Sequence, residues 1–156
     1  MKNLFIYLLL ITSFPAIAQQ KSNSSKAIKM PVPVLQKLLM AGKFDYRAIN
    51  DSLYQVDFTG DNIERFKVLI SKISDLYVIA VDVTEDMNLE LKPEKYKMLL
   101  SKNDEYDMVK IGISESNNHL YVRCDTYSNI TSVVVLKKLI NQVSAVTDII
   151  AGELKK

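Results

Sequence analysis

The chain has 156 residues, 48% of them hydrophobic, which is enough for one domain with an ordinary buried core. It carries 20 lysines and arginines against 18 aspartates and glutamates, a formal charge of +2. This balance argues against the strongly basic class of nucleic-acid-binding domains. The single cysteine, Cys124, can form no disulfide within the chain, so stability must come from the apolar core.

Residues 1–18 have the three parts of a secretory signal peptide. A positively charged start precedes the apolar run LFIYLLLI (4–11), and Ala16 and Ala18 then form the small-residue pattern that signal peptidase recognises. The apolar run is much shorter than the ~20 residues that span a bilayer, and no cysteine follows for a lipid anchor. We therefore predict cleavage after Ala18, which leaves a periplasmic or secreted chain without a membrane span.

Residues 19–30 (QQKSNSSKAIKM) are polar and rich in serine, so they cannot bury enough apolar surface to order themselves. We predict that they form a flexible tether to a single domain over residues 31–156. Leucines spaced i, i+3, i+4 give residues 34–41 an apolar face, and Gly42 follows as a stop signal. The domain is therefore expected to open with a short helix.

Four strand patterns follow, divided by turn-forming residues. Residues 44–49, 53–58 and 63–73 alternate apolar and polar side chains, which predicts strands with one buried face. Residues 76–83 are apolar on both faces and rich in β-branched side chains. We expect this segment to form a central strand that is covered on both sides.

The second half begins with an acidic connection over residues 84–90. Pro93 then stands at a first helical position, which predicts a helix of about ten residues. Residues 108–114 and 120–127 form a predicted hairpin, and residues 131–154 carry an apolar stripe that predicts a long final helix. The order α-β-β-β(-β)-α-β-β-α predicts an α+β fold, in which helices pack on one face of an antiparallel sheet.

Three segments in the second half carry a resemblance to a known family. They are Leu99-Leu100-Ser101-Lys102-Asn103, Val109-Lys110-Ile111-Gly112-Ile113 and Leu120-Tyr121-Val122-Arg123-Cys124-Asp125. With the long final helix, they resemble the YbjN family of bacterial sensory transduction regulators over residues 31–150. This resemblance implies the fold that the family shares with type III secretion chaperones. It brings no catalytic residues, and the familiar members act in the cytoplasm, whereas this chain is predicted to be exported.

Residues capable of catalysis or metal binding are few. His119 is the only histidine, in the loop of the predicted hairpin, and a metal site needs several converging ligands. We interpret His119 as an exposed turn residue, and we expect no catalytic site, no metal and no cofactor. Cys124 shares a strand face with apolar residues, so we expect it to lie in the core.

Carboxylates are concentrated in residues 75–115. The closest group consists of Asp82, Glu85, Asp86 and Glu90. Its spacing is irregular and lacks the glycine of a calcium loop, so we interpret it as a solvated acidic loop. The alternative is a weak contact with a cation or a protein.

Tyrosines on the predicted strands suggest an interaction surface, because a tyrosine combines an apolar ring with a polar tip. We interpret the strand tyrosines as residues that border the core. The alternative is that the sheet face opposite the helices, with Tyr54 and Tyr121, binds a protein partner or a second copy of the chain. Asp51-Ser52-Leu53 also resembles a site that some bacteria O-glycosylate on exported proteins, which makes Ser52 a candidate for modification.

These observations favour an exported, non-enzymatic protein that binds another protein, either an envelope partner or a second copy in a homodimer. No basic face indicates nucleic acid as a partner. Two alternatives stay open. One is a small secreted hydrolase that uses carboxylates of the acidic stretch, Asp107 included. The other is an accessory subunit of an envelope complex.

Overall fold

The computed structural model describes residues 33–88 and 92–156. The predicted signal peptide, the predicted tether and Glu90 of the acidic stretch lie outside the described residues. Among the helices of the described segments, none is both long enough and apolar enough to cross a bilayer.

The described chain begins with a short helix and a β-hairpin. α1 (Val34–Ala41) ends at Gly42, as the leucine spacing predicts, and buries two of its leucines. β1 (Tyr46–Asn50) and β2 (Leu53–Phe58) then pair in antiparallel fashion. The bounds of α1 and β2 agree with the sequence prediction.

Four further strands complete one sheet of six. They are β3 (Phe66–Ile73), β4 (Leu76–Asp82), β5 (Lys110–Ile113) and β6 (Leu120–Tyr127). The order across the sheet is β1-β2-β3-β4-β6-β5, and every neighbouring pair is antiparallel. The predicted antiparallel sheet is therefore confirmed, with β1 and β5 as its two edges.

α4 (Val133–Lys155) is the long final helix that the apolar stripe predicts. Ser132 caps its start, because the Ser132 hydroxyl oxygen accepts a hydrogen bond from the backbone N–H of Val135 at 3.3 Å. Three valines open the helix, so burial of the stripe outweighs their weak helix propensity. The stripe packs on β4 and β6. Its buried hydrophobic members are Leu136, Leu139, Ile140, Val143, Val146, Ile150, Ala151 and Leu154.

Two short helices connect β4 to β5. α2 (Val83–Met87) stands where the sequence predicts an acidic connection over residues 84–90. Asp82 caps α2 by accepting a hydrogen bond from the backbone N–H of Glu85 at 2.9 Å. The helix was not predicted because five residues are too few to show an apolar period. α3 (Pro93–Lys102) begins at the proline, as predicted.

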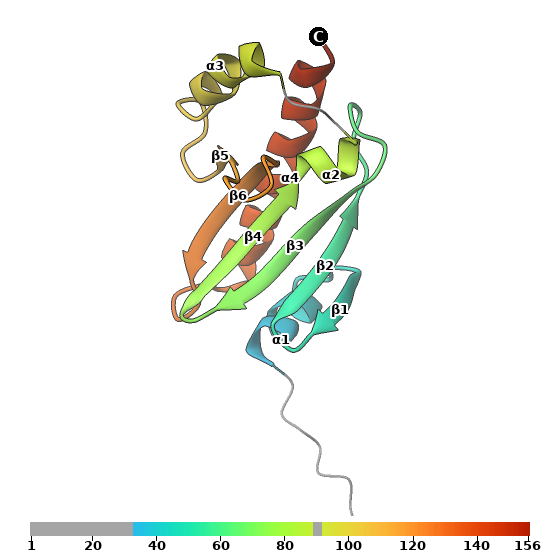
Figure 1. Cartoon of the computed structure of the whole chain (residues 1–156). Coiled ribbons are helices and arrows are strands. Elements are labelled where there is room, and N and C mark those ends of the chain that lie inside the picture. The colour runs from blue at the N-terminus through green and yellow to red at the C-terminus, as the bar shows by residue number, and fades with distance from the viewer. Residues whose placement is uncertain (1–32, 89–91) are drawn as a thin grey trace, which may run out of the picture. The chain divides into compact units, whose positions relative to one another are not determined.

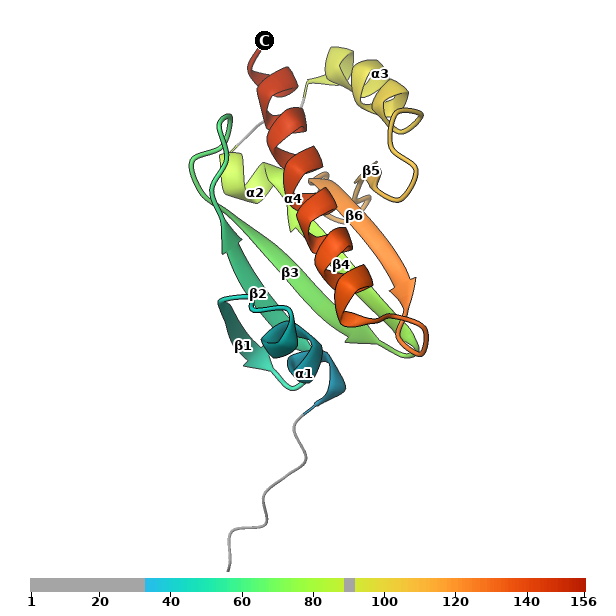
Figure 2. The ribbon, with the colours of Figure 1, turned by 180° about the vertical axis from the view of Figure 1, so that it is seen from behind.

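Helices α1 and α4 lie on the same face of the sheet. Figures 1 and 2 show α1 against β1 and β2, and α4 along the middle of the sheet, with α2 and α3 near one end. The prediction that β4 is covered on both sides is wrong, because its second face carries no helix. Val78 on that second face is still only 7% exposed. Its neighbours on β3 and β6 are Ser71 and Asp125, whose side chains flank it.

Candidate protein-binding surface

The candidate site is the sheet face that carries no helix, called the open face from here on. Side chains alternate between the two faces of a sheet, so burial of Tyr77, Ile79 and Val81 under α4 assigns the residues between them to the open face. The strand register extends this assignment to the other strands. The open face includes Arg47, Gln55, Asp57, Lys67, Leu69, Ser71, Val78, Ala80, Asp82, Tyr121, Arg123 and Asp125.

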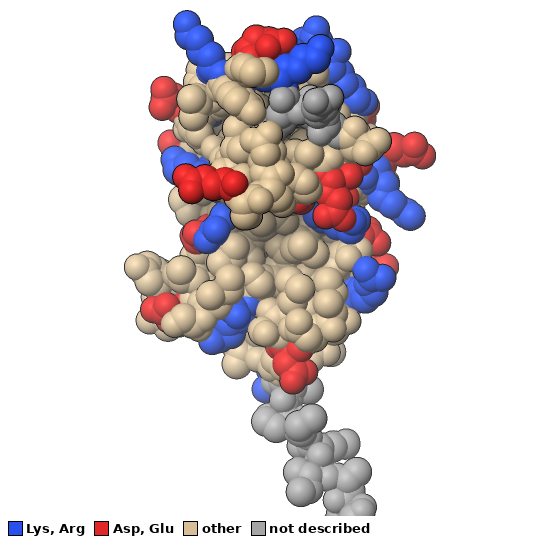
Figure 3. All heavy atoms as spheres, in the orientation of Figure 1, with Lys and Arg blue, Asp and Glu red and all other residues tan. Residues whose placement is uncertain are grey.

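Charged side chains surround an uncharged centre on the open face. The register places Leu69 of β3 opposite Ala80 of β4, and Val78 lies two residues before Ala80 on β4. Figure 3 shows the result: lysines, arginines and carboxylates are spread around a centre without charge. A small apolar centre inside a polar rim is the usual anatomy of a protein interface.

One side of this centre is bordered by a chain of hydrogen bonds through Gln55. The Gln55 side-chain oxygen accepts from Arg47 Nη2 at 2.8 Å, and Gln55 Nε2 donates to Asp57 Oδ1 at 2.6 Å. Gln55 itself is only 7% exposed. A buried amide with both ends bonded holds its partners in place. The charges of Arg47 and Asp57 are therefore presented in fixed positions.

The other side of the centre is bordered by Tyr121 and Arg123 of β6. Arg123 donates to the Asp125 carboxylate from Nε at 2.8 Å and from Nη2 at 2.9 Å, which raises the pKa of the guanidinium. The Tyr121 ring lies over Gly112 of β5, where a Cβ would come within 2.6 Å of the ring. The missing side chain at Gly112 thus leaves room for Tyr121 against the edge strand.

Three carboxylates of the acidic stretch gather at one corner of the open face, beside a shallow hollow of about 190 Å³. The Asp86 carboxylate accepts from the backbone N–H of Lys67 at 3.0 Å, and Lys67 Nζ lies 3.0 Å from Glu85 Oε1 and 3.5 Å from Asp86 Oδ1. The hydrogen bond to Glu85, followed by the charge of Asp86, raises the pKa of Lys67. These contacts hold α2 to the start of β3. The interpretation as a solvated acidic segment therefore fails for Asp86, whose side chain is 7% exposed, whereas the Glu85 side chain is 62% exposed.

Comparison with known proteins identifies the fold. No known family model matches the sequence, and no curated protein matches it. A chain of the heterodimeric ExoU–SpcU complex from the type III secretion system of Pseudomonas aeruginosa matches with a TM-score of 0.53 at 14% identity, over 76% of this chain and 95% of that one. YbjN from E. coli matches with a TM-score of 0.53 at 13% identity, over 76% and 87%. A chain of the ExsC–ExsE complex matches with a TM-score of 0.55 at 12% identity, over 77% and 92%.

The chain shares the fold of these three proteins. Identities of 12–14% establish this shared fold and nothing finer. The resemblance noted in the sequence is thus confirmed at the level of the fold, and membership of the YbjN family stays a prediction.

The two tyrosines that are candidates for partner binding lie on opposite faces of the sheet. Tyr121 lies on the open face, opposite Gly112 and Asp82. Tyr54 lies on the covered face, is 1% exposed and belongs to the core. Tyr54 is therefore not available to a partner on the open face, and the binding role stays a prediction for Tyr121 alone.

His119 holds two elements together and is not a free turn residue. Its Nδ1 lies 2.6 Å from Asp82 Oδ2, and its side chain is 34% exposed. The next residue, Leu120, donates its backbone N–H to Thr84 Oγ1 at 2.8 Å. The two contacts tie the β5–β6 loop to the start of α2. Within residues 33–88 and 92–156, no three His, Cys, Asp or Glu side chains are arranged to hold a metal ion.

The two other residues singled out in the sequence lie in contrasting environments. Cys124 is buried on the covered face, as predicted, and burial followed by the Asp125 charge raises the pKa of its thiol. A thiol in this state is a poor nucleophile. Ser52 is exposed in the turn between β1 and β2, where its backbone N–H donates to Asn50 Oδ1 at 2.9 Å. Its glycosylation stays a prediction.

Asn103 closes one edge of the sheet, a role that no local pattern in the sequence predicts. The Asn103 side chain accepts from the backbone N–H of Ile111 at 2.7 Å and donates to the Ile111 carbonyl oxygen at 2.9 Å. Ile111 lies in the edge strand β5, so the amide takes the place of a further strand there. An asparagine directly after a predicted helix indicates a cap or turn, but the sequence does not show that its partner is the backbone of Ile111.

Replacing Asn103 with alanine should lower the free energy of unfolding by about 2 kcal/mol, because two backbone groups of Ile111 lose their partner. Urea unfolding followed by circular dichroism measures the change. Asn141, exposed on α4, is the matched control, and its replacement by alanine should cost less than about 0.5 kcal/mol. Equal effects of the two substitutions would show that the Asn103 bonds contribute nothing net.

Proposed function

We propose that this protein is an exported, non-enzymatic interaction protein that binds a protein partner through its open face. The observation that carries the proposal is the open face itself. It is one side of a six-stranded sheet, it bears no helix, and its uncharged centre lies inside a charged rim. The charged groups of the rim are held by their own hydrogen bonds, so they need little ordering when a partner binds.

The likeness to solved structures supports the same proposal at the level of the fold. Two of the similar chains come from complexes between two proteins, ExoU–SpcU and ExsC–ExsE. A shared fold does not by itself carry a shared function. The open face, with Tyr121 and Arg123 at its border, therefore defines the binding site that we propose.

The predicted signal peptide sets the compartment in this proposal. An exported chain meets periplasmic and envelope proteins or a second copy of itself. A homodimer formed through the open face, and an accessory role in an envelope complex, are both forms of the same proposal. They differ only in the chain that covers the open face.

The contacts of the acidic residues give less support to a secreted hydrolase. A general acid or base must face the substrate, whereas Asp82 caps α2 and pairs with His119, and Asp86 binds Lys67. Asp107 lines a different hollow, between the loop before β5 and α4. Asp82 and Asp86 thus hold the fold together, and Asp107 lies apart from the shallow hollow beside them.

Replacing Tyr121 with serine should weaken partner binding at least about tenfold, because aromatic residues supply much of the energy of protein interfaces. The unfolding midpoint should stay close to that of the unaltered chain, since Tyr121 is only partly buried. Sedimentation equilibrium measures self-association, and capture from envelope extracts measures binding to another protein.

Met40 provides the matched control. It is 59% exposed on α1, on the other side of the sheet, so its replacement by serine should leave association unchanged. If the Tyr121→Ser and Met40→Ser chains bind equally well in both assays, Tyr121 is not part of a binding site, and the proposed role of the open face is contradicted.

A further inference from the structure

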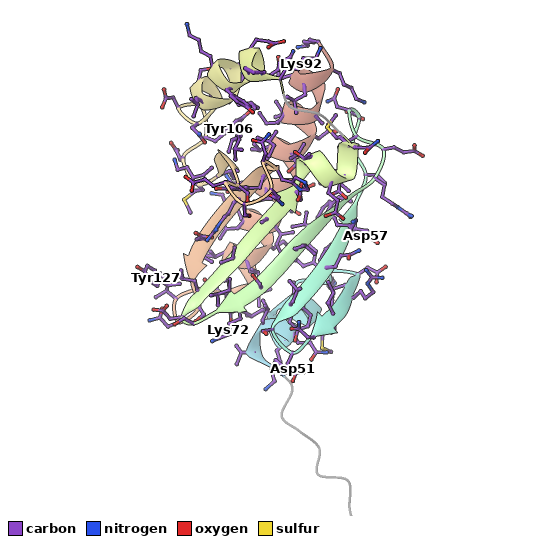
Figure 4. The ribbon with its side chains drawn as sticks, in the orientation of Figure 1. Asp51, Asp57, Lys72, Lys92, Tyr106 and Tyr127 are labelled. Atoms are coloured by element: carbon purple, nitrogen blue, oxygen red, sulfur yellow. The ribbon has the colours of Figure 1, made fainter. Side chains whose placement is uncertain are left out.

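A hollow of about 220 Å³ lies between α3 and the hairpin of β5 and β6, and we call it the α3 hollow. Figures 1 and 2 show α3 beside this hairpin at one end of the sheet. In Figure 4, Lys92 marks the start of α3, and Tyr106 lies in the loop that returns the chain to β5. The side chains that line the hollow are those of Tyr96, Leu99 and Leu100 of α3, Ile111 and Ile113 of β5, and Leu120 of β6.

The lining of the α3 hollow is almost wholly apolar. Among the described residues that line it, none is charged, and the hydroxyl of Tyr96 is the one polar side-chain group. Leu99, Ile111 and Leu120 are buried and belong to the main core, whereas Leu100 is 68% exposed. The hollow therefore extends from solvent beside Leu100 to the edge of the core.

The size and chemistry of the α3 hollow favour an apolar occupant. An ordered water needs two to four polar partners, which this lining does not offer. A cavity of ~150 Å³ with leucine, isoleucine and phenylalanine walls stays dry and binds benzene. On that scale the larger α3 hollow has room for about eight carbon atoms. A hydrocarbon group of this size fits the hollow better than water or an ion does.

The packing of α3 is incomplete while the hollow is empty. α3 has ten residues, and Leu99 is the only one of them that is buried. Isolated helices shorter than about 12–15 residues are marginal in water, so a helix of this length depends on its packing. Tyr96 and Leu100 are four residues apart, on one face of α3, and both line the hollow. A group that filled the hollow would cover both side chains and complete the contact of α3 with the hairpin.

Hydrogen bonds fix the two walls of the α3 hollow to each other. The Asn103 side chain binds both backbone groups of Ile111, which attaches the end of α3 to β5. The backbone N–H of Asn103 also donates to the Leu100 carbonyl oxygen at 3.1 Å, so the last turn of α3 is closed. The hollow is therefore formed before any ligand arrives, and binding requires little ordering of the protein.

We propose that the α3 hollow binds an aliphatic chain of about eight carbon atoms, the hydrocarbon part of a small amphiphile. The leucine and isoleucine side chains bury the chain, and the Tyr96 hydroxyl offers a hydrogen bond to a polar end group. The hollow is open on one side, so a linear molecule can keep its polar end in solvent, which favours a chain over a ring. This proposal does not depend on the protein-binding role of the open face.

Titration with unbranched alcohols, followed by the NMR signals of leucine and isoleucine methyl groups, tests the proposal. From butanol to octanol, affinity should rise by up to about fourfold with each methylene, given ~0.8 kcal/mol for each buried CH₂. Decanol should bind no better than octanol, because its additional carbons lie outside the hollow. The signals that shift should be those of Leu99, Leu100, Ile111, Ile113 and Leu120. The absence of a saturable shift in these signals, up to the solubility limit of octanol, overturns the proposal.

Two pairs of variants locate the bound alcohol. Ile113→Trp should lower the affinity for octanol at least about tenfold, because the larger side chain fills the hollow. Leu53→Trp is its matched control, since Leu53 is half-buried like Ile113 but lies in β2, and its affinity should be unchanged. Leu100→Ser should lower the affinity about threefold, and Met40→Ser, at a similarly exposed position on α1, should not. Equal affinities within both pairs overturn the proposal, and the exposed pair decides if a tryptophan variant does not fold.

Hydrogen exchange gives a second readout, because a ligand that completes the packing of α3 opposes its local opening. With octanol at about ten times its Kd, the amides of α3 should exchange about tenfold more slowly. The Ile113→Trp chain should show no such slowing at the same octanol concentration. Saturable octanol binding without slower exchange in α3 would show that the alcohol binds elsewhere, and would overturn the proposal.

Discussion

Replacing Tyr54 with serine is expected to lower the free energy of unfolding by about 4 kcal/mol, the cost of removing a large aromatic ring from a packed core. Tyr54 is 1% exposed, and its ring meets that of Tyr46 edge to face, with centroids 5.7 Å apart and planes at 73°. Its hydroxyl donates to the carbonyl oxygen of Asp51 at 3.2 Å. Serine fills little of this space and reaches none of these partners. Urea unfolding measures the loss.

Tyr121 supplies the comparison, because it lies on the opposite face of the same sheet. Its replacement by serine should cost less than about 1 kcal/mol, since its side chain already meets solvent. A loss at Tyr54 as small as that at Tyr121 would contradict the assignment of Tyr54 to the covered face. The pair therefore separates a stabilising tyrosine from one that is free to bind.

Replacing Asp148 with alanine is expected to cost about 3 kcal/mol, because charged acceptors make the stronger hydrogen bonds. Asp148 lies on α4 and accepts from the backbone N–H groups of Asn62 and Ile63 at 2.8 and 3.1 Å, and from Asn62 Nδ2 at 3.2 Å. Its carboxylate sits so close to Gly60 that a Cβ on that residue would overlap it. Loss of the carboxylate would release the loop between β2 and β3 from the helix.

The Asp148 carboxyl also predicts a pH dependence. Burial opposes its ionisation, but hydrogen bonds from the backbone of Asn62, Ile63 and Asp61 outweigh burial and hold its pKa below the ordinary value of 3.8. A carboxyl with a lowered pKa stabilises the fold fully above its unfolded pKa, and the contribution is lost as the pH falls through the folded pKa. The unaltered chain and the Asp148→Ala chain should therefore differ most at neutral pH and converge in acid.

Two substitutions serve as controls for Asp148. Asp148→Asn keeps an acceptor of the same shape without the charge, so it should lose about half as much stability at neutral pH, and this deficit should shrink in acid as the unaltered carboxyl becomes neutral. Asp61→Ala, in the same loop but exposed, should lose less than about 0.5 kcal/mol. A constant difference between the unaltered and alanine chains from neutral to acid pH would show that the charge of Asp148 is not the source of stability.

Local patterns in the sequence predict most of the elements. β2 and β6 alternate in period two, and α1, α3 and α4 show helical spacing, so each was predicted within about two residues. The same alternation already places Tyr54 beside Val56, and Tyr121 opposite Leu120 and Val122. Alternation along the whole of each strand therefore assigns the two tyrosines to different faces of the sheet. Tyr54 was wrongly named as a candidate for partner binding because its residue type was considered without its position in the strand.

Contacts between distant residues could not be predicted in the same way. Asp148 is 86 positions from Asn62, and Asp82 is 37 positions from His119. A periodic pattern reports which face a residue occupies, but it does not report which residue of another element stands opposite. The asparagine, histidine and carboxylates of such contacts look like surface residues in a single sequence. These residues come within hydrogen-bond distance of one another only in the folded chain.

The asparagine bonded to Ile111 has a consequence for how copies of this sheet can join. Strands add to a sheet only where backbone groups are unpaired, and Asn103 occupies those of Ile111 at the β5 edge. The other edge, β1, has four exposed residues, and no side chain of residues 33–88 and 92–156 bonds to its backbone in the way that Asn103 bonds to Ile111. If the β5 edge is blocked, two copies can pair only through their β1 edges. A third copy then finds no free edge strand, so the assembly stops at a dimer. The side-chain amide of Asn103 thus opposes the growth of fibres by edge-to-edge pairing of sheets.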